Sequence, residues 1–451
     1  MKNAVIIAIV MTLAMMGWNV QSRAEEFTKV DTGKVVAALK DPNWVVVDTR
    51  LNDAFNGWKL DGITRGGHIN GAVDFSANWL KVEEKNLKEP LQEILATKGI
   101  TPDKQIVLYD ANGKDADNVA KFLHSLNYPH LFTYDVKQWA ADTDLPMTKY
   151  ENYHLIVPAV VVKEILDGKY PETFKQDKPI KLIEASWGEE KTSYAKGHIP
   201  TTFHINTDRV EPPTPTEPPM WILADDATLG KLALEIGVTK NDTVIVTSEE
   251  PLAAYRVATV LRYTGVDDVR VLNGGTLAWT MAGYELETER HNPVPVKDFG
   301  GPVPGHPEVI DTMAETKAGL AEPDRFILVD NRTWQEHIGE ISGYSYHDKK
   351  GRIPGAIFGY AGKKDSYGME YFRNPDKTMR NAEEFLALWR EQGIDTSKHL
   401  SFMCGSGWRV AEIYTYADVY GLDDIGIFSD GWIGWSTDPA NPIVTGVPKK
   451  N

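Results

Sequence analysis

The segment GLDDIGIFSDGWIGW (421–435) matches GVDDVRVLNGGTLAW (265–279) without a gap. Each segment has a short apolar run after an acidic pair and then a turn containing glycine, which is the pattern of a buried strand that leads into a helix. An interval of 17 residues precedes both segments and recurs near the start of the chain, so one α/β unit is predicted to occur three times. The three intervals run from Asp110 to Asn127, from Ser248 to Gly265 and from Cys404 to Gly421.

A second apolar run occurs in each unit and ends in an acidic residue. Helix-like segments alternate with these runs, and that alternation is typical of a parallel sheet covered by helices. We therefore predict an α/β fold with three tandem domains, each a parallel sheet flanked by helices. The runs are NWVVVDTR (43–50), IKLIEASW (180–187) and RFILVDNR (325–332), and their acidic ends are Asp48, Glu184 and Asp330.

Two linker-like stretches separate the three units. The first is DTDLPMTKYENYH (142–154), and the second is the Pro- and Gly-rich HNPVPVKDFGGPVPGHP (291–307). A third Pro-rich stretch, EPPTPTEPP (211–219), lies inside the second unit and predicts an extended surface insertion, either a docking segment or a stiff loop. The predicted domains cover residues 25–150, 151–297 and 298–451.

The first 24 residues have the pattern of a secretory signal peptide. Lys2 precedes an apolar run (4–18), and small residues, Ser22 and Ala24, precede the expected cleavage site. The run is shorter than the roughly 20 residues that span a bilayer. We therefore expect a soluble, exported protein, periplasmic in a bacterium, with no membrane association after cleavage. Its single cysteine excludes an intramolecular disulfide.

Charge and composition exclude several classes of partner. The chain has 48 basic and 64 acidic residues, a formal net charge of −16, which argues against nucleic acid and an anionic membrane surface. Its 11 histidines are scattered, without the spacing of a metal site, and no Gly-rich Lys loop for phosphate is present. We predict no metal, no nucleotide and no other cofactor.

The single cysteine, Cys404, begins the stretch CGSGWR (404–409) between an apolar run and a helix-like segment. Ligands bind at such strand-to-helix turns in α/β sheets. Gly405 and Gly407 permit unusual backbone conformations and Ser406 is small, so several amide N–H groups can converge on one anion. The helix amino end and Arg409 favour a nucleophilic thiolate and would stabilise a persulfide. Arg409 either orients an anionic donor or shapes the loop.

Four motifs resemble the rhodanese family, and the chain from residue 25 to 451 resembles its three-domain periplasmic thiosulfate sulfurtransferases. The resemblance implies that Cys404 takes a sulfane sulfur and holds it as a persulfide. It also implies that residues Gly405, Ser406, Gly407, Trp408 and Arg409 cradle the sulfur, with Asp330 and Arg332 as support. The motifs are FMCGSGWR (402–409), SGYSYHDKKGRIPGA (342–356), NPDKTMR (374–380) and DGWIGWSTDPANP (430–442).

The family resemblance also implies the partners. The donor is expected to be a small sulfur anion, and the acceptor a thiol or cyanide or a protein that accepts sulfur. The CGSG opening is similar to mercaptopyruvate sulfurtransferases, whereas Trp408 and Arg409 fit neither their usual loop nor that of two-domain thiosulfate enzymes. Thiosulfate and mercaptopyruvate therefore both stay open as donors.

The first two units carry Asp110 and Ser248 where the third carries Cys404, and neither can hold a transferable sulfur. These domains are predicted to be inactive and to scaffold the third or contribute walls to its cleft. The third unit has 74 residues between its acidic strand end and Cys404, against 64 and 62 in the others. We interpret the extra length, within residues 342–351 and 363–380, as a lid.

Several other side chains of the third unit have two possible roles. Arg373 and Arg380 are candidate anion ligands, although exposed arginines are common on any surface. His337 and His347 could act as acids or bases, but we expect solvated loop histidines. Three tryptophans, Trp334, Trp432 and Trp435, are expected to belong to the core.

Two other functions use the same thiol. A cysteine phosphatase also cradles a thiolate before an Arg, but its loop has five intervening residues and this one has four. A binding protein that carries sulfur without turnover is the second alternative. Both alternatives remain open at this point, beside a sulfurtransferase that acts through a Cys404 persulfide.

Overall fold

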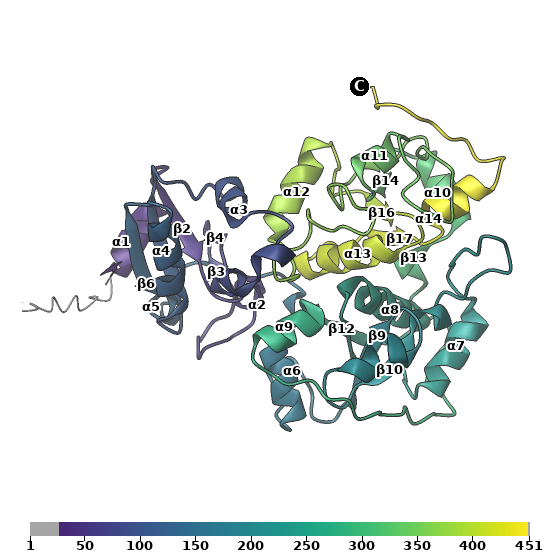
Figure 1. The fold of residues 1–451 in the computed structure, drawn as a ribbon, viewed down its shortest axis with the longest axis horizontal. Helices are drawn as coiled ribbons and strands as arrows, with labels where there is room; N and C mark the ends of the chain where they lie inside the picture. Colours follow the sequence, from purple (N-terminus) through teal and green to yellow (C-terminus); the bar gives the residue numbers. More distant parts are fainter. Residues whose placement is uncertain (1–26, 450–451) are drawn as a thin grey trace, which may run out of the picture.

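The computed structural model describes residues 27–449 and contains three five-stranded parallel sheets (Figure 1). The sheets share one topology, with a short strand at each edge and the strand that ends in the acid next to the centre. The predicted fold class is confirmed. The expected signal peptide lies outside the described residues. Within residues 27–449, no helix is both long and apolar enough to cross a lipid bilayer.

The first sheet, with the order β1-β6-β5-β2-β4, consists of Thr28–Lys29, Leu131–Asp135, Gln105–Asp110, Trp44–Asp48 and Val73–Asp74. Its helices are α1 (Thr32–Ala38), α2 (Asn52–Asn56), α3 (Leu91–Thr97), α4 (Asp115–Ser125) and α5 (Val136–Ala141). A separate antiparallel pair joins β3 (His68–Ile69) to β7 (Met147–Thr148).

The second sheet, with the order β10-β9-β11-β12-β8, consists of Phe203–Asn206, Ile180–Ser186, Thr243–Thr247, Asp268–Leu272 and Ile156–Val157. Its helices are α6 (Ala159–Leu166), α7 (Asp226–Glu235), α8 (Pro251–Thr264) and α9 (Gly275–Met281).

The third sheet, with the order β13-β17-β16-β14-β15, consists of Ile310–Asp311, Ile425–Phe428, His399–Met403, Phe326–Asp330 and Ile357–Phe358. Its helices are α10 (Met313–Leu320), α11 (Trp334–His337), α12 (Ala382–Glu391), α13 (Trp408–Tyr420) and α14 (Gly431–Thr437).

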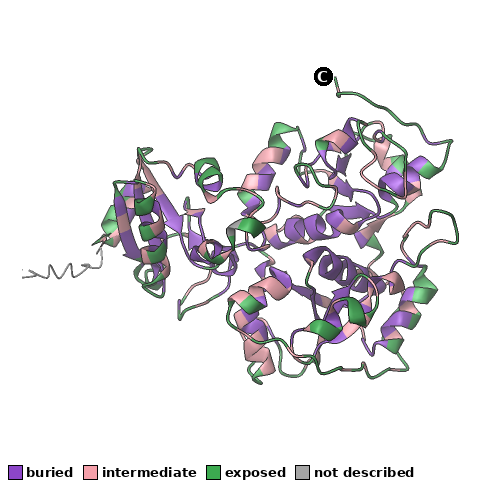
Figure 2. Cartoon of the chain, in the orientation of Figure 1, coloured by how far each residue is buried: buried purple, intermediate pink, exposed green. Residues whose placement is uncertain are grey.

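Helices α8 and α13 lie side by side and join the second sheet to the third (Figure 1). Both are buried along most of their length, as Figure 2 shows, because each packs on its own sheet and on the other helix. Tyr255 and Tyr416 meet edge to face between them, with ring centroids 5.3 Å apart. The second and third domains therefore share one hydrophobic core, which fixes the amino end of α13 relative to the second domain.

The first domain has hydrophobic clusters of its own and lies to the left in Figure 1. Its attachment to the others is both apolar and polar, because Phe55 and Trp58 join the hydrophobic core of the second and third domains. Lys98 donates to Asp74 at 2.8 Å and pairs with Glu384 of α12, and Asn78 donates to Asp376 at 3.1 Å. These buried contacts bring the first domain against the segment after residue 373.

Of the three tryptophans that were expected in the core, two are buried and one is exposed. Trp432 and Trp435 are buried, as predicted. Trp334 is 37% exposed, so the prediction for it was wrong. It is the first residue of the short helix α11 and stacks on His337 with ring centroids 5.7 Å apart, so one ring face covers that histidine.

Candidate active site

The loop that begins at Cys404 connects β16 to α13 at the carboxyl edge of the third sheet. Cys404 is only 2% exposed. Gly407 is the N-cap of α13 with φ +93°, a left-handed conformation that favours glycine. A tight turn is thereby formed directly in front of a helix amino end, which is where an anion is stabilised.

Helix α14 fixes the orientation of this loop. The amides of Trp432 and Ile433 donate to the carbonyls of Cys404 and Gly405, at 2.8 and 3.0 Å. In a planar trans peptide the N–H points away from the C=O, so the next two amides, of Gly405 and Ser406, point away from α14. That arrangement leaves them free to face an anion held by the loop.

Arg409 is buried and makes two hydrogen bonds to the carboxylate of Glu336, at 3.0 and 3.1 Å. It also donates to the hydroxyl of Tyr344 at 2.5 Å. Burial lowers the pKa of Arg409, but Glu336, Tyr344 and Cys404 together outweigh burial and hold that pKa well above its usual range. These three hydrogen bonds hold the Arg409 guanidinium against α11 and Tyr344 at the wall of the loop.

Tyr344 closes the loop from the side of the predicted lid. A Cβ atom on Gly405 would lie 2.2 Å from the hydroxyl oxygen of Tyr344, so only glycine fits there. Burial, Glu336 and the thiol of Cys404 raise the pKa of Tyr344, against the effect of Arg409. The phenol is therefore protonated at neutral pH and can donate a hydrogen bond next to the loop.

Asp330 and Arg332 form a buried ion pair at the end of β14, with hydrogen bonds of 2.8 and 2.7 Å. Arg332 holds the pKa of the buried Asp330 carboxyl well below its usual range, although burial alone would raise it. The guanidinium lies over the ring of Trp432, 4.8 Å from its centroid. The pair contacts α14 behind the loop, so its support for Cys404 is indirect.

His337 belongs to the same buried network. Its Nδ1 lies 2.8 Å from a carboxylate oxygen of Asp330, and the side chain is fully buried. The interpretation of His337 as a solvated loop histidine was therefore wrong, because the short helix α11 folds it under Trp334. His347 is half-buried, and its Nε2 lies 2.7 Å from the hydroxyl of Ser436.

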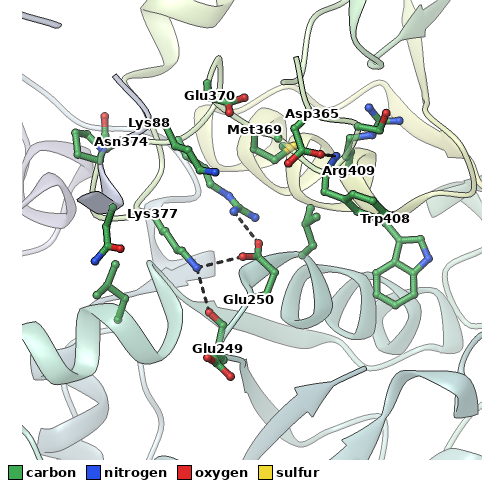
Figure 3. Close-up of a pocket in the computed structure, with 18 of the residues that line it drawn as sticks. Lys88, Glu249, Glu250, Asp365, Met369, Glu370, Asn374, Lys377, Trp408 and Arg409 are labelled. Atoms are coloured by element: carbon green, nitrogen blue, oxygen red, sulfur yellow. Dashed lines mark hydrogen bonds and ion pairs between the residues drawn. The ribbon is translucent and has the colours of Figure 1, made fainter. Parts of the chain in front are cut away.

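A cavity of about 1540 Å³ opens beside Cys404, with walls from all three domains (Figure 3). The contribution of the first two domains agrees with the expectation that they supply cleft walls. Gly407 does not line it and faces the second domain instead. The lining residues of the third domain include Cys404, Gly405, Ser406, Trp408 and Arg409, together with 344–346, 365–370 and 373–375.

The two candidate anion-binding arginines are held in ion pairs. Arg373 is bound by Glu412 at 2.6 Å and by Glu250 of the second domain at 2.8 Å, and Arg380 pairs with Glu384. Neither is the exposed arginine that the sequence suggested, because acidic groups from neighbouring helices neutralise both. Lys377 also donates to Glu250, at 3.1 Å (Figure 3).

Sequence reasoning missed four residues that contact the loop. Glu336 and Tyr344 lie on the third domain, and Glu211 and Arg256 reach it from the second. A signal for Arg256 was present, because it is the one charged residue in the apolar run PLAAYRVATVL (251–261) of helix α8. Glu211 begins the Pro-rich insertion, which was predicted to be exposed, yet it is fully buried.

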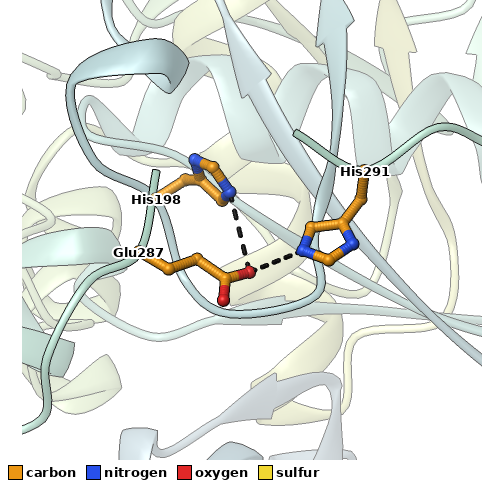
Figure 4. Close-up of side chains that lie close together, drawn as sticks. All are labelled: His198, Glu287 and His291. Carbon is orange, nitrogen blue, oxygen red and sulfur yellow. Dashed lines mark hydrogen bonds and ion pairs between the residues drawn. The ribbon is translucent and has the colours of Figure 1, made fainter. Parts of the chain in front are cut away.

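One His/Glu cluster lies outside this site. His198, Glu287 and His291 point toward one another in the second domain (Figure 4), with ligand atoms within 4.8 Å of one another. Both ring nitrogens of His198 are already within hydrogen-bond distance of backbone carbonyls, those of Tyr194 at 2.8 Å and Glu289 at 3.0 Å. The cluster therefore joins the turn at residue 198 to the segment after residue 284, and the absence of a metal stays a prediction.

A single thiol in a glycine-containing turn, between a parallel strand and a helix, is the arrangement of α/β domains that cradle a reactive cysteine. The chain belongs to the rhodanese family, because the model of the Rhodanese-like domain matches residues 31–142, 169–282 and 312–438. It is 35% identical over 411 residues to the thiosulfate sulfurtransferase YnjE of Escherichia coli K12, and the aligned residues cover 90% of each chain. Human 3-mercaptopyruvate sulfurtransferase is 26% identical over 57% of this chain and 85% of its own length.

Solved structures of EanB are similar over nearly the whole chain. One, a complex of a variant with ergothioneine, has a TM-score of 0.86 and 34% identity, covering 94% of this chain and 100% of that one. The anaerobic ergothioneine biosynthesis enzyme of Chlorobium limicola, in complex with trimethyl histidine, has a TM-score of 0.86 and 33% identity over the same shares. A further EanB structure carries a persulfide on its cysteine. This chain is accordingly a sulfurtransferase of the rhodanese family.

Proposed function

We propose that Cys404 is the nucleophile and sulfur carrier of this sulfurtransferase. The observation that carries the proposal is the position of Cys404, the only cysteine of the chain, in a turn before a helix amino end and beside a large cavity. Gly405, Ser406, Gly407 and Trp408 form the cradle. Arg409, Asp330 and Arg332 keep its shape.

The donor step is a displacement at sulfur. The Cys404 thiolate attacks the outer sulfur of thiosulfate, the S–S bond of the donor breaks, and sulfite leaves with the bonding pair. The product is the persulfide Cys404–S–S⁻, whose charge the loop amides and the helix amino end stabilise. The acceptor then attacks the outer sulfur, and the thiolate of Cys404 is restored.

Thiosulfate is the proposed donor because YnjE, named as a thiosulfate sulfurtransferase, is similar over 90% of the chain. Mercaptopyruvate is the alternative donor, supported by the CGSG opening and by the likeness to the human enzyme. We further propose that the protein is exported to the periplasm through its first 24 residues. A thiol or cyanide, or a protein thiol, is the proposed acceptor.

Trimethyl histidine is a second candidate acceptor. EanB structures hold trimethyl histidine or ergothioneine, and they are 33–34% identical to this chain. The cavity here exceeds what thiosulfate or cyanide requires, and Tyr344, Tyr346 and Trp408 line it. Aromatic faces attract a quaternary ammonium group, so the cavity suits an acceptor of amino-acid size.

The decisive experiment is the intact mass of the mature protein after thiosulfate and then after cyanide, with Cys404→Ser alongside. A gain of one sulfur atom that cyanide removes, and that the serine variant lacks, is expected. Repeated turnover with donor and acceptor excludes a pure carrier, and an aryl phosphate serves as the probe for phosphatase activity. Formation of ergothioneine from trimethyl histidine would identify trimethyl histidine as an acceptor. No gain with thiosulfate or mercaptopyruvate overturns the proposal.

A further inference from the structure

The second domain places a buried ion pair against the loop of the third. Glu211 and Arg256 are both 0% exposed, and Arg256 donates from Nε to Glu211. The other carboxylate oxygen of Glu211 accepts the indole N–H of Trp408 at 2.6 Å. Helix α13 therefore begins with a side chain that is anchored in the neighbouring domain.

Arg256 also contacts the turn before Trp408. Its Nη2 donates to the hydroxyl of Ser429 at 2.6 Å, at the end of β17. A Cβ atom on Gly407 would lie 2.7 to 2.9 Å from three atoms of the guanidinium, so arginine and glycine backbone pack closely. Two features of position 407 therefore favour glycine. One is its left-handed backbone conformation, and the other is the lack of space for a Cβ atom beside Arg256.

The pair contributes geometry and little net charge. Glu211 and Arg256 form a neutral unit when both are ionised, so their combined field at the thiol is small. Arg256 has one nitrogen, Nη1, without a hydrogen-bond partner among the described residues, and this nitrogen lies against Gly407. Buried polar groups are normally hydrogen-bonded, so the position of this unpaired nitrogen against the Gly407 turn is unusual.

Trp408 also takes part in a wall of the cavity. Its ring lies 5.7 Å from that of Trp187 of the second domain, and both residues line the cavity beside Cys404. The hydrogen bond to Glu211 fixes the indole in the plane that meets Trp187. Two domains thereby define the surface that a bound donor or acceptor meets.

We propose that Glu211 and Arg256 are positioning residues for sulfur transfer. The second domain, which lacks a cysteine, fixes the Gly407 turn and the indole of Trp408, and through them the position of Cys404 in the cavity. This inference rests on the proposed function of Cys404. It gives the second domain a role that its own loop chemistry does not supply.

The test compares Glu211→Ala, Glu211→Gln and Trp408→Phe with Arg262→Ala as a matched control. Arg262 also lies on α8 and pairs with Asp418 of α13, so its loss weakens the same interface without touching the loop. We expect kcat/KM to fall about 10- to 100-fold in Glu211→Ala, because small misplacements of a reacting group have effects of that size. In Arg262→Ala, kcat/KM is expected to stay within about twofold of the wild-type value, because this change does not displace the Cys404 loop.

Two further readouts separate positioning from stability. Glu211→Gln keeps an oxygen that accepts the indole N–H, so the folded variant is expected to recover most of kcat/KM even though its stability falls because Arg256 loses its charged partner. The rate at which iodoacetamide alkylates Cys404, measured against pH, needs no sulfur donor. It is expected to change in Glu211→Ala and Trp408→Phe but not in Arg262→Ala, whatever the outcome for the proposed function.

Equal losses in Glu211→Ala and Arg262→Ala would overturn the inference, because domain docking would then explain both. Unchanged alkylation and kcat/KM in a folded Glu211→Ala variant would also overturn it. Should Glu211→Ala fail to fold, Trp408→Phe decides, because it removes the hydrogen bond to Glu211 from the side of the third domain and keeps an aromatic ring there. A wild-type protein that forms no persulfide refutes the proposed function. The alkylation rates of the variants would still test whether Glu211 and Arg256 position the Cys404 loop.

Discussion

The guanidinium of Arg409 forms a buried, bidentate ion pair with the carboxylate of Glu336, so the last residue of the Cys404 loop is anchored on helix α11. Glu336 also completes the capping box of that helix, where it accepts the backbone N–H of Thr333 at 3.0 Å. One carboxylate therefore caps the amino end of a helix and fixes a loop. Burial raises the pKa of Glu336, but Arg409, Arg332 and the amide of Thr333 together outweigh burial and hold that pKa below its usual range.

Replacing one member of this pair is expected to be costly. Glu336→Gln or Arg409→Met should lower the free energy of unfolding by about 3–5 kcal/mol, because a buried charge loses its partner. Urea denaturation measures the change. The exposed pair Arg390–Glu383 is the control, and Arg390→Ala should change stability by less than about 1 kcal/mol. Similar small effects at both pairs would contradict the expectation.

The close approach of Gly405 to Tyr344 predicts a steric effect that a second mutation relieves. Gly405→Ala should displace the Tyr344 ring, because the added Cβ would lie 2.2 Å from its hydroxyl oxygen. We expect a loss of sulfur transfer of about 10- to 100-fold. Two ring carbons of Tyr344 would also lie 2.4 and 2.9 Å from the added Cβ, so only removal of the ring relieves the clash. The losses of Gly405→Ala and Tyr344→Ala should therefore be less than additive in the double variant. Additive losses in a double-mutant cycle would show that the two side chains act independently.

Glu184 of β9 and Asp330 of β14 occupy corresponding places in their sheets but lie in different environments. This difference predicts opposite effects when each is replaced by its neutral amide. Asp330 is paired with Arg332, two residues later, whereas Glu184 has Ser186 at that position and one oxygen without a partner in the described chain. Burial, with a contribution from Glu249, raises the pKa of Glu184 to about 8.

Because the pKa of Glu184 is higher in the folded state, the wild type should lose stability as the pH rises from about 4 to about 8. Glu184→Gln should remove that loss, by a few kcal/mol at pH 9, while changing little at pH 5. Asp330→Asn should destabilise the protein at neutral pH, since Arg332 loses its partner. Thermal unfolding from pH 5 to 9 measures all three proteins, and parallel profiles for Glu184→Gln and wild type would refute the assignment.

Repetition made the fold predictable from sequence, because matching runs such as 265–279 and 421–435 report the same strand and helix. Local pattern also indicated the strand-to-helix turn at Cys404. Contacts between distant residues were not predictable in the same way. Glu211 lies 197 residues from Trp408, and the buried contact of His337 with Asp330 forms only when β14 and α11 meet. Such side chains were read as surface residues because their partners come from other elements.

A junction of all three domains holds two buried carboxyls and predicts a second pH effect. Asp53 of the first domain accepts a hydrogen bond of 2.8 Å from Asn273 of the second, near Asp376 of the third. Burial raises the pKa of Asp53 to about 7, and Asp376 adds to the shift. Burial also raises the pKa of Asp376.

The folded state therefore binds the Asp53 proton more tightly than the unfolded state does, and stability should fall from about pH 4 to about pH 7 and then level off. Asp53→Asn should remove this part of the pH dependence and stabilise the junction at pH 8, because the neutral amide keeps an oxygen for Asn273. The exposed Asp177→Asn is the control and should leave the profile unchanged. Limited proteolysis within residues 142–154 measures detachment of the first domain. Cleavage that is equally fast at pH 5 and pH 8 in wild type and Asp53→Asn would show that this carboxyl does not control the junction.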